Sequence, residues 1–147
     1  RSDPTAQIVK NLVGKGTGTL FGVRVEKRAL VFNSGTGNGT LFSWQNPEDS
    51  EILATVLVHV TTAGTGTAGV DIGVAGNGTG SSDDLLDAAR VDTVDLVRNG
   101  ADDKGTNGRM FRRVDEKDGT NDYIVGKAND VDATAVASIY IVYIPTL

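Results

Sequence analysis

The chain has 147 residues, a formal net charge of −5 and no cysteine. This length fits one domain with a core of its own, and the lack of cysteine excludes disulfides, thiolate metal sites and cysteine nucleophiles. The acidic balance argues against a nucleic-acid groove, which needs clustered Lys and Arg, and no apolar run approaches the roughly 20 residues of a membrane helix. We therefore expect neither nucleic acid nor a membrane as a partner.

The first predicted element is a short N-terminal helix with an apolar stripe. Asp3-Pro4-Thr5 offers an N-cap with Pro at the first helical position, and a glycine at position 14 stands where the helix would end. Two i,i+4 pairs, Ile8 with Leu12 and Val9 with Val13, share one face. A helix of about ten residues is marginal alone in water, so this one must dock on its own domain or on a neighbouring subunit.

A glycine-rich linker, Gly14–Gly18, follows this helix and gives little rigid connection to the rest of the chain. The sequence therefore predicts two parts. Residues 1–18 form an N-terminal arm with its linker, and residues 19–147 form a β domain.

From Leu20 onward the hydrophobic period changes to two, which predicts β-strands. Val23 and Val25 alternate with Arg24 and Glu26, as in a half-buried strand. Further strand-like runs are separated by Asn, Asp and Gly turn signals and cover 40–44, 52–61, 70–74, 93–97, 109–114, 123–128 and 134–144. With the run over 21–32 counted once, we predict about eight strands in an all-β sandwich or barrel.

The run over 52–61 is apolar on both of its faces. Val56, Val58 and Val60 share one face, while Leu53 and Leu57 share the other face with a histidine at position 59. Such a pattern indicates a strand that is central in its sheet or covered on its outer side.

The pattern G-x-G-x-x-G occurs at Gly64, Gly66 and Gly69. It binds dinucleotides only where a strand precedes it and a helix follows it. Here the run Val70–Val74 is another strand, so we expect a hairpin turn between two strands and no nucleotide site.

A second short helix is predicted near residues 82–89, because Ser81–Ala89 begins with a serine cap and acids in its first turn. Acidic residues also gather at 102–103, 115–122 and 130–132. Oxygen-rich loops can hold Ca²⁺, but Lys117 occupies a ligand position of the EF-hand pattern in the loop 115–119. We favour solvated acidic loops over a metal site.

Catalytic signatures are absent from the sequence. His59 is the only histidine, so no cage of several histidines can form; we expect it to be a hydrogen-bonded structural residue. Neither G-x-S-x-G nor H-E-x-x-H occurs. We expect a protein that is not an enzyme, with no catalytic, cofactor-binding or metal residue.

The order of several segments carries a resemblance. Gly39-Thr40-Leu41-Phe42 precedes the long valine-rich run, which ends in Val60-Thr61-Thr62-Ala63-Gly64. Then come Gly69–Val74, Ser81–Ala89, Asp122–Val125 and Ser138–Pro145. Over about residues 39–147 the chain resembles the small jelly-roll-type β-sandwich proteins of tailed-bacteriophage heads known as decoration or cement proteins.

The resemblance implies a non-enzymatic virion protein, made in the host cytoplasm, that binds the major capsid protein on the outer capsid surface and stabilises the capsid as a homotrimer. The N-terminal arm would then supply the capsid or subunit contact, through Ile8, Val9, Lys10, Leu12, Val13 and Lys15. Two other functional hypotheses stay open. One is a carbohydrate- or receptor-binding tip of a tail fibre, with Trp44 and Tyr123 as stacking residues; the other is a small hydrolase built on the acidic loops.

Overall fold

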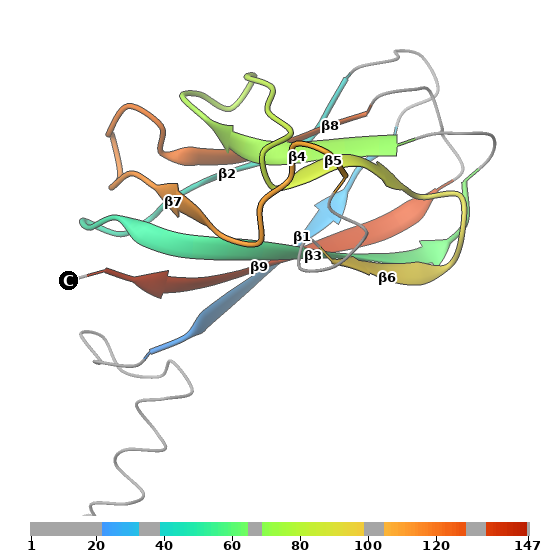
Figure 1. The fold of residues 1–147 in the computed structure, drawn as a ribbon, viewed down its shortest axis with the longest axis horizontal. Coiled ribbons are helices and arrows are strands. Elements are labelled where there is room, and N and C mark those ends of the chain that lie inside the picture. Colours follow the sequence, from blue (N-terminus) through green and yellow to red (C-terminus); the bar gives the residue numbers. More distant parts are fainter. Residues whose placement is uncertain (1–21, 33–38, 65–68, 99–104, 129–134, 147) are drawn as a thin grey trace, which may run out of the picture.

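The computed structural model describes residues 22–32, 39–64, 69–98, 105–128 and 135–146. Within these ranges the chain forms strands and connecting loops but no helix, so no helix there could cross a membrane. The strands lie in two antiparallel sheets (Figure 1). They are β1 (Arg24–Leu30), β2 (Thr40–Gln45), β3 (Ile52–Thr62), β4 (Gly69–Ala75), β5 (Leu86–Arg90), β6 (Asp95–Arg98), β7 (Arg112–Val114), β8 (Tyr123–Ala128) and β9 (Val136–Pro145).

The five-stranded sheet has the order β1-β9-β3-β6, and β7 also pairs with β3. β6 pairs with the second half of β3, from Leu57 to Val60, whereas β7 pairs with the first half, from Ile52 to Ala54. Both run antiparallel to β3, so they are two pieces of one edge strand that the chain leaves after β6 and rejoins at β7. The four-stranded sheet has the order β2-β8-β4-β5.

Counted with β6 and β7 as one, eight strands are divided four to each sheet in the arrangement of a jelly roll, and every connection except the one from β4 to β5 crosses between the sheets. This arrangement recurs in viral capsid domains, lectin domains and cupins. The predicted all-β, antiparallel, jelly-roll-like sandwich of about eight strands is confirmed.

The core lies between the two sheets and is filled by the inward face of each strand. β3 places Val56, Val58 and Val60 there, all fully buried, as the alternation in the sequence predicted. Trp44 of β2 meets Tyr143 of β9 across the core, with ring centroids 5.2 Å apart. Isoleucine and leucine side chains complete this layer, among them Ile52, Ile72, Leu85, Leu86, Ile124, Ile139 and Ile141.

The helix predicted near residues 82–89 is wrong. Residues 86–90 form β5, which pairs with β4, and Leu85 and Leu86 are both buried in the core. A bulge interrupts this pairing between Val70 and Ile72, and Ala88 takes a positive φ of 55° there. The Asp71 side chain accepts a hydrogen bond from the Ala88 backbone N–H at 2.8 Å. This long-range hydrogen bond holds a conformation that breaks any helix.

The hairpin predicted between the strands at 52–61 and 70–74 is also wrong. β3 belongs to the five-stranded sheet and β4 to the four-stranded sheet, so the connection crosses from one layer to the other (Figure 1). The Gly64 backbone N–H donates to the Val91 carbonyl at 2.8 Å, which ties the start of the crossing to the chain beyond β5. Sequence patterns give the period of each strand but not its pairing partner.

Alkaline pH tests the enclosure of Tyr143, whose side chain is 3% exposed. Burial raises the pKa of this phenol above its ordinary value, and the charges of nearby Arg24, Glu26 and Arg28 have smaller effects. The unfolded chain ionises near pH 10, before the folded chain does. We therefore expect the free energy of unfolding to fall as the pH rises above about 10.

Urea unfolding between pH 8 and pH 11 measures this effect. Tyr143→Phe removes the ionisable group and should give a shallower alkaline decline than the unchanged protein. Tyr140→Phe is the matched control, because that ring lies on the outer side of the same strand. If the free energy of unfolding declined equally with pH in Tyr143→Phe and in the unchanged protein, the proposed effect of the Tyr143 pKa would be contradicted.

Candidate interaction surface

An exposed apolar surface covers the side of the five-stranded sheet that faces away from the core. Register partners on neighbouring strands lie on the same face, and three rows of partners build this surface. Leu53 lies beside Ile144, Val142 lies between Val25 and a threonine of β3, and Tyr140 lies beside Leu57. We call this surface the outer sheet face and define it by Val23, Val25, Leu53, Leu57, Tyr140, Val142 and Ile144.

Four of these side chains are open to solvent to a degree that is unusual for their type. Val25 is 60% exposed, Ile144 41%, Val23 39% and Leu53 37%. Single exposed apolar residues are normal on any protein, whereas neighbouring ones mark interaction sites. The outer sheet face is therefore the strongest candidate for a contact with another protein segment.

The orientation of β1 is the reverse of the sequence prediction. Val25 was expected to help fill a half-buried face, yet it points outward, while Leu30 on the opposite face of the strand is buried. The inward-facing side therefore also carries Arg24, Glu26 and Arg28. These charges lie where β1 forms the edge of its sheet, and charged residues on an edge strand hinder pairing with another strand.

The inward charges of β1 have partners of opposite sign. Arg24 forms an ion pair with Glu48, and Arg28 Nη1 lies 2.9 Å from Glu26 Oε2. Because these pairs occupy the inner side of the strand, the valines remain on the outside.

Lys27 and Tyr140 form the polar part of the outer sheet face. They are register partners on β1 and β9, and the Lys27 ammonium lies 5.6 Å from the centre of the Tyr140 ring. At this distance a cation is attracted to the face of the ring. β1, β3 and β9 place no carboxylate on this face.

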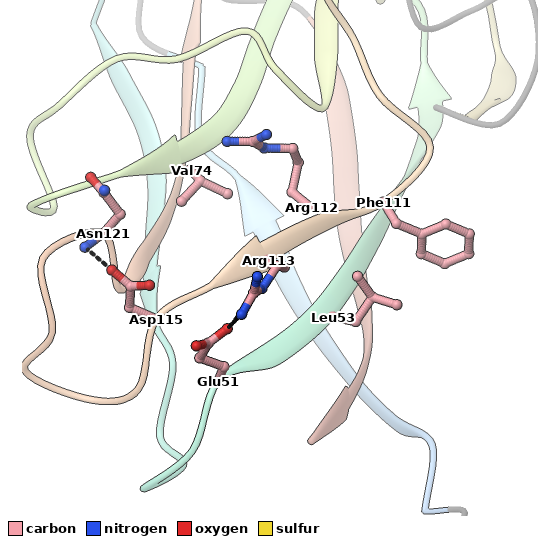
Figure 2. A pocket seen from close by; sticks show the side chains of 8 residues that line it. All are labelled: Glu51, Leu53, Val74, Phe111, Arg112, Arg113, Asp115 and Asn121. Carbon is pink, nitrogen blue, oxygen red and sulfur yellow. Dashed lines mark hydrogen bonds and ion pairs between the residues drawn. The ribbon is translucent and has the colours of Figure 1, made fainter. Parts of the chain in front are cut away.

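The tip of the outer sheet face near Leu53 borders an open pocket of about 660 Å³ (Figure 2). Arg113 donates through Nε to Glu51 Oε2 at 2.8 Å. Arg112 Nε lies 3.0 Å from Asp84 Oδ2, an ion pair without the alignment of a hydrogen bond. The pocket is lined by Glu51, Leu53, Val74, Phe111, Arg112, Arg113, Asp115 and Asn121.

Both arginines of this pocket are already matched by carboxylates, which leaves little charge to attract a free anion. Phe111 is 48% exposed and lines the pocket together with Leu53. Charged and polar side chains therefore dominate this edge, and Leu53 and Phe111 are its exposed apolar residues.

The acidic residues 83–87, for which a helix was predicted, instead bind the loop between β6 and β7. Asn107 donates to Asp83 Oδ2 through its side-chain amide at 2.9 Å, and to Asp87 Oδ2 through its backbone N–H at 3.0 Å. Asp84 accepts from the Val74 backbone N–H at 2.9 Å. These carboxylates are used as structural hydrogen-bond acceptors while their side chains stay partly exposed.

The acidic loop 115–122 is likewise engaged in the structure. Asp122 is 2% exposed and accepts hydrogen bonds from Gln45 Nε2 at 2.7 Å and from the Asp118 backbone N–H at 3.0 Å. Asp115 accepts from the Asn121 backbone N–H at 2.8 Å. Across the described ranges, no group of three His, Asp or Glu side chains is placed to hold a metal ion.

Asn46 is the buried centre of this second network. Its amide donates to the carbonyls of Ser50 and Asp115, at 3.1 and 2.8 Å, and its oxygen accepts from the Glu48 N–H at 2.9 Å. The Asn46 backbone N–H donates to the Asp122 carbonyl at 2.8 Å. One side chain therefore joins the turn after β2 to the loop before β8.

The candidate residues named from the sequence lie in different parts of the structure. The six contact candidates of the N-terminal arm, Ile8, Val9, Lys10, Leu12, Val13 and Lys15, lie outside the described residues. His59 lies on the exposed side of β3 rather than inside the apolar layer. Trp44 is 6% exposed and packs on Tyr143, so it offers no open ring for a sugar.

Sequence reasoning missed the outer sheet face as a site, although one signal was present. Leu53 and Leu57 alternate with the core valines of β3, which showed a second apolar side on that strand. The missing information was that Val25 and Val142 would join them from two other strands.

No protein-family model and no curated protein matches the chain. Among solved structures, it is similar to a chain of the crystal structure of the infectious bursal disease virus VP2 subviral particle. The TM-score is 0.34 and the sequence identity is 14%. The similarity covers 84% of this chain and 33% of that one, so the chain spans about a third of that protein's length.

Proposed function

We propose that the chain is a non-enzymatic structural protein of a tailed bacteriophage that binds the major capsid protein on the outer capsid surface and stabilises the capsid. It would act as a homo-oligomer, with a trimer favoured by the resemblance to decoration proteins, and would be found on the virion after synthesis in the host cytoplasm. Neither nucleic acid nor a membrane is proposed as a partner.

The observation that carries this proposal is the exposed apolar face on a jelly-roll domain. The exposed valines, leucine and isoleucine of the outer sheet face offer contact area rather than reactive groups. Symmetric repetition then adds weak contacts together through effective concentration. Two acidic clusters that a hydrolase would need are committed to backbone and side-chain hydrogen bonds within the fold, which supports a non-enzymatic role.

The rival function, a carbohydrate- or receptor-binding module of a tail fibre, has less support. It would rely on aromatic rings presented to a sugar, and Trp44 is enclosed in the core. Tyr123 is only partly exposed. A glycan array tests this rival: binding that is lost on Tyr123→Ala would favour it over capsid binding.

Deletion of residues 1–18 tests the proposed capsid contact. The segment carries Ile8, Val9, Leu12 and Val13 as apolar anchors for a capsid or subunit contact, with Lys10 and Lys15 as charges able to meet an acidic surface. We expect the truncated protein to occupy capsids of the encoding phage at least tenfold more weakly than the full chain. Occupancy is measured by co-sedimentation with expanded capsids over a range of protein concentrations.

Lys10→Ala combined with Lys15→Ala is the matched control for charge. We expect this variant to bind more weakly at low salt and to approach the full chain at high salt, because salt screens exposed charges. Thermal unfolding of the truncated protein verifies that its β domain is intact. Undiminished capsid occupancy by a folded truncated protein would overturn the role of the arm.

A further inference from the structure

We propose that the outer sheet face is the seat for the N-terminal segment of a neighbouring copy, with residues 5–13 of that copy lying across it. This inference rests on the proposed function, because it presupposes an oligomer. It deepens that function by naming the two surfaces that meet between copies.

The chemistry of the face suits an aliphatic stripe. Val25 and Val142 lie side by side in its middle row, and the row beside them contains Leu57 and Tyr140. The segment offers Ile8, Val9, Leu12 and Val13 on one side of its predicted helix. On the face, Val25, Leu53 and Ile144 are exposed within the described fold.

The size of the face favours a segment over a whole second domain. Three neighbouring strands at about 4.8 Å spacing and five residues at about 3.3 Å rise give a flat area of roughly 15 by 17 Å. A standard interface buries roughly 800 Å² on each partner, about three times this flat area. A nine-residue helix, about 14 Å long and about 10 Å wide, fits within it.

The charges favour an encounter between two copies. The segment 1–21 holds three basic residues, Arg1, Lys10 and Lys15, against one acid, Asp3, whereas the whole chain has a net charge of −5. The segment is therefore attracted to a neighbouring molecule as a whole, while the face itself, which carries Lys27, is contacted through its apolar side chains. Lys10 lies on the side of the predicted helix away from the apolar stripe, so it is directed to solvent rather than onto Lys27.

The point where the segment joins the β domain favours a neighbour over the same chain. β1 runs from Arg24 to Leu30 beside β9, and the chain therefore enters it at the end of the face where Val23 and Ile144 lie. The axis of β1, extended backwards from Arg24, points away from the face. Nine residues from 14 to 22 extend up to about 30 Å, which is enough to reach an adjacent copy without a reversal.

Complementation between two variants tests the inference, in free protein and without capsids. The truncated protein lacking residues 1–18 keeps the face but has no segment. Val25→Asp keeps the segment but places a carboxylate in the middle of the face, at a position exposed enough for the fold to tolerate it. Val31→Asp is the matched control. Val31 is 56% exposed, and its backbone N–H bonds to Leu41 of the other sheet.

Sedimentation equilibrium gives the association constants. We expect the full chain and Val31→Asp to form oligomers, and each of the two defective variants alone to associate at least tenfold more weakly. Mixed together, the two defective variants should form a 1:1 complex, because one supplies the face and the other the segment.

Other results would overturn the inference. An oligomer that survives the deletion but is lost in Val25→Asp would mean that two faces meet directly. Two weakened variants that fail to complement would place the segment on its own chain or on a different partner, and a monomeric full chain would remove the contact altogether. A stable oligomer that does not bind capsids would overturn only the proposed function, and capsid binding without complementation would overturn only this inference.

Discussion

Replacing Gly126 with valine is expected to lower the free energy of unfolding by about 3 kcal/mol. Gly126 lies in β8, between β2 and β4, where its register partners are Phe42 and Ile72. A Cβ at this position would lie 2.6 Å from Cε1 and 2.7 Å from Cδ1 of the Phe42 ring. The ring is 8% exposed, so it cannot move aside without opening the core. Urea denaturation measures the loss.

A double-mutant cycle shows whether the clash with the ring is the cause. Phe42→Ala alone should destabilise by about 3–5 kcal/mol, because it leaves a cavity. Combined with Gly126→Val, it should cost less than the two single changes added together, because the valine then fills part of the space. Strictly additive losses would contradict this account. Gly78→Val is the control, since its Cβ would first meet the movable Ser43 hydroxyl, at 3.2 Å.

Replacing Asn46 with alanine is expected to cost about 3 kcal/mol. The change removes three hydrogen bonds of a fully buried amide, and each is worth roughly 1 kcal/mol, with more lost where a partner stays unsatisfied. The affected groups are the carbonyls of Ser50 and Asp115 and the N–H of Glu48. Chemical denaturation measures the stability, and hydrogen exchange should show faster opening of the loop 115–122 than of β3.

Asn77→Ala is the matched control for this change. Asn77 also accepts hydrogen bonds, from the Thr79 N–H at 3.0 Å and the Thr79 hydroxyl at 2.9 Å, but in an exposed turn. Water can replace these bonds, so we expect a loss below about 1 kcal/mol. Equal losses of unfolding free energy in Asn46→Ala and Asn77→Ala would show that the burial of Asn46 adds nothing to the stability that its hydrogen bonds provide.

The two polar networks stabilise the fold, whereas the outer sheet face is proposed to make contacts with another molecule. Asp84 and Asp122 hold loops through backbone hydrogen bonds, whereas the outer sheet face leaves Val25 and Ile144 in solvent. These acceptors therefore stabilise the loops against the strands. The proposed contacts depend on the outer sheet face, to which those acceptors contribute no side chain. Stability and the proposed contacts can therefore be changed independently.

Where a residue pattern was local, the sequence predicted the structure well. The run over 123–128 became β8 with the same bounds, and the run over 52–61 became β3. The helix near 82–89 failed because serine and acids next to one another were read as a cap. Their true partners, Val74, Asn107 and Arg112, lie elsewhere in the chain, and only folding brings them close.

The sequence by itself determined that the chain is an all-β sandwich, because alternation with period two fixes which side chains of a strand share a face. It also determined that Val56, Val58 and Val60 belong together. Only the tertiary structure decided which face of β1 turns outward and which sheet receives β4. Both depend on partners far along the chain: charges at Glu26 and Glu48 hold one side of β1, and β9 supplies Val142 beside Val25. Burial of a face is a property of the layers that meet, and no single strand carries that information.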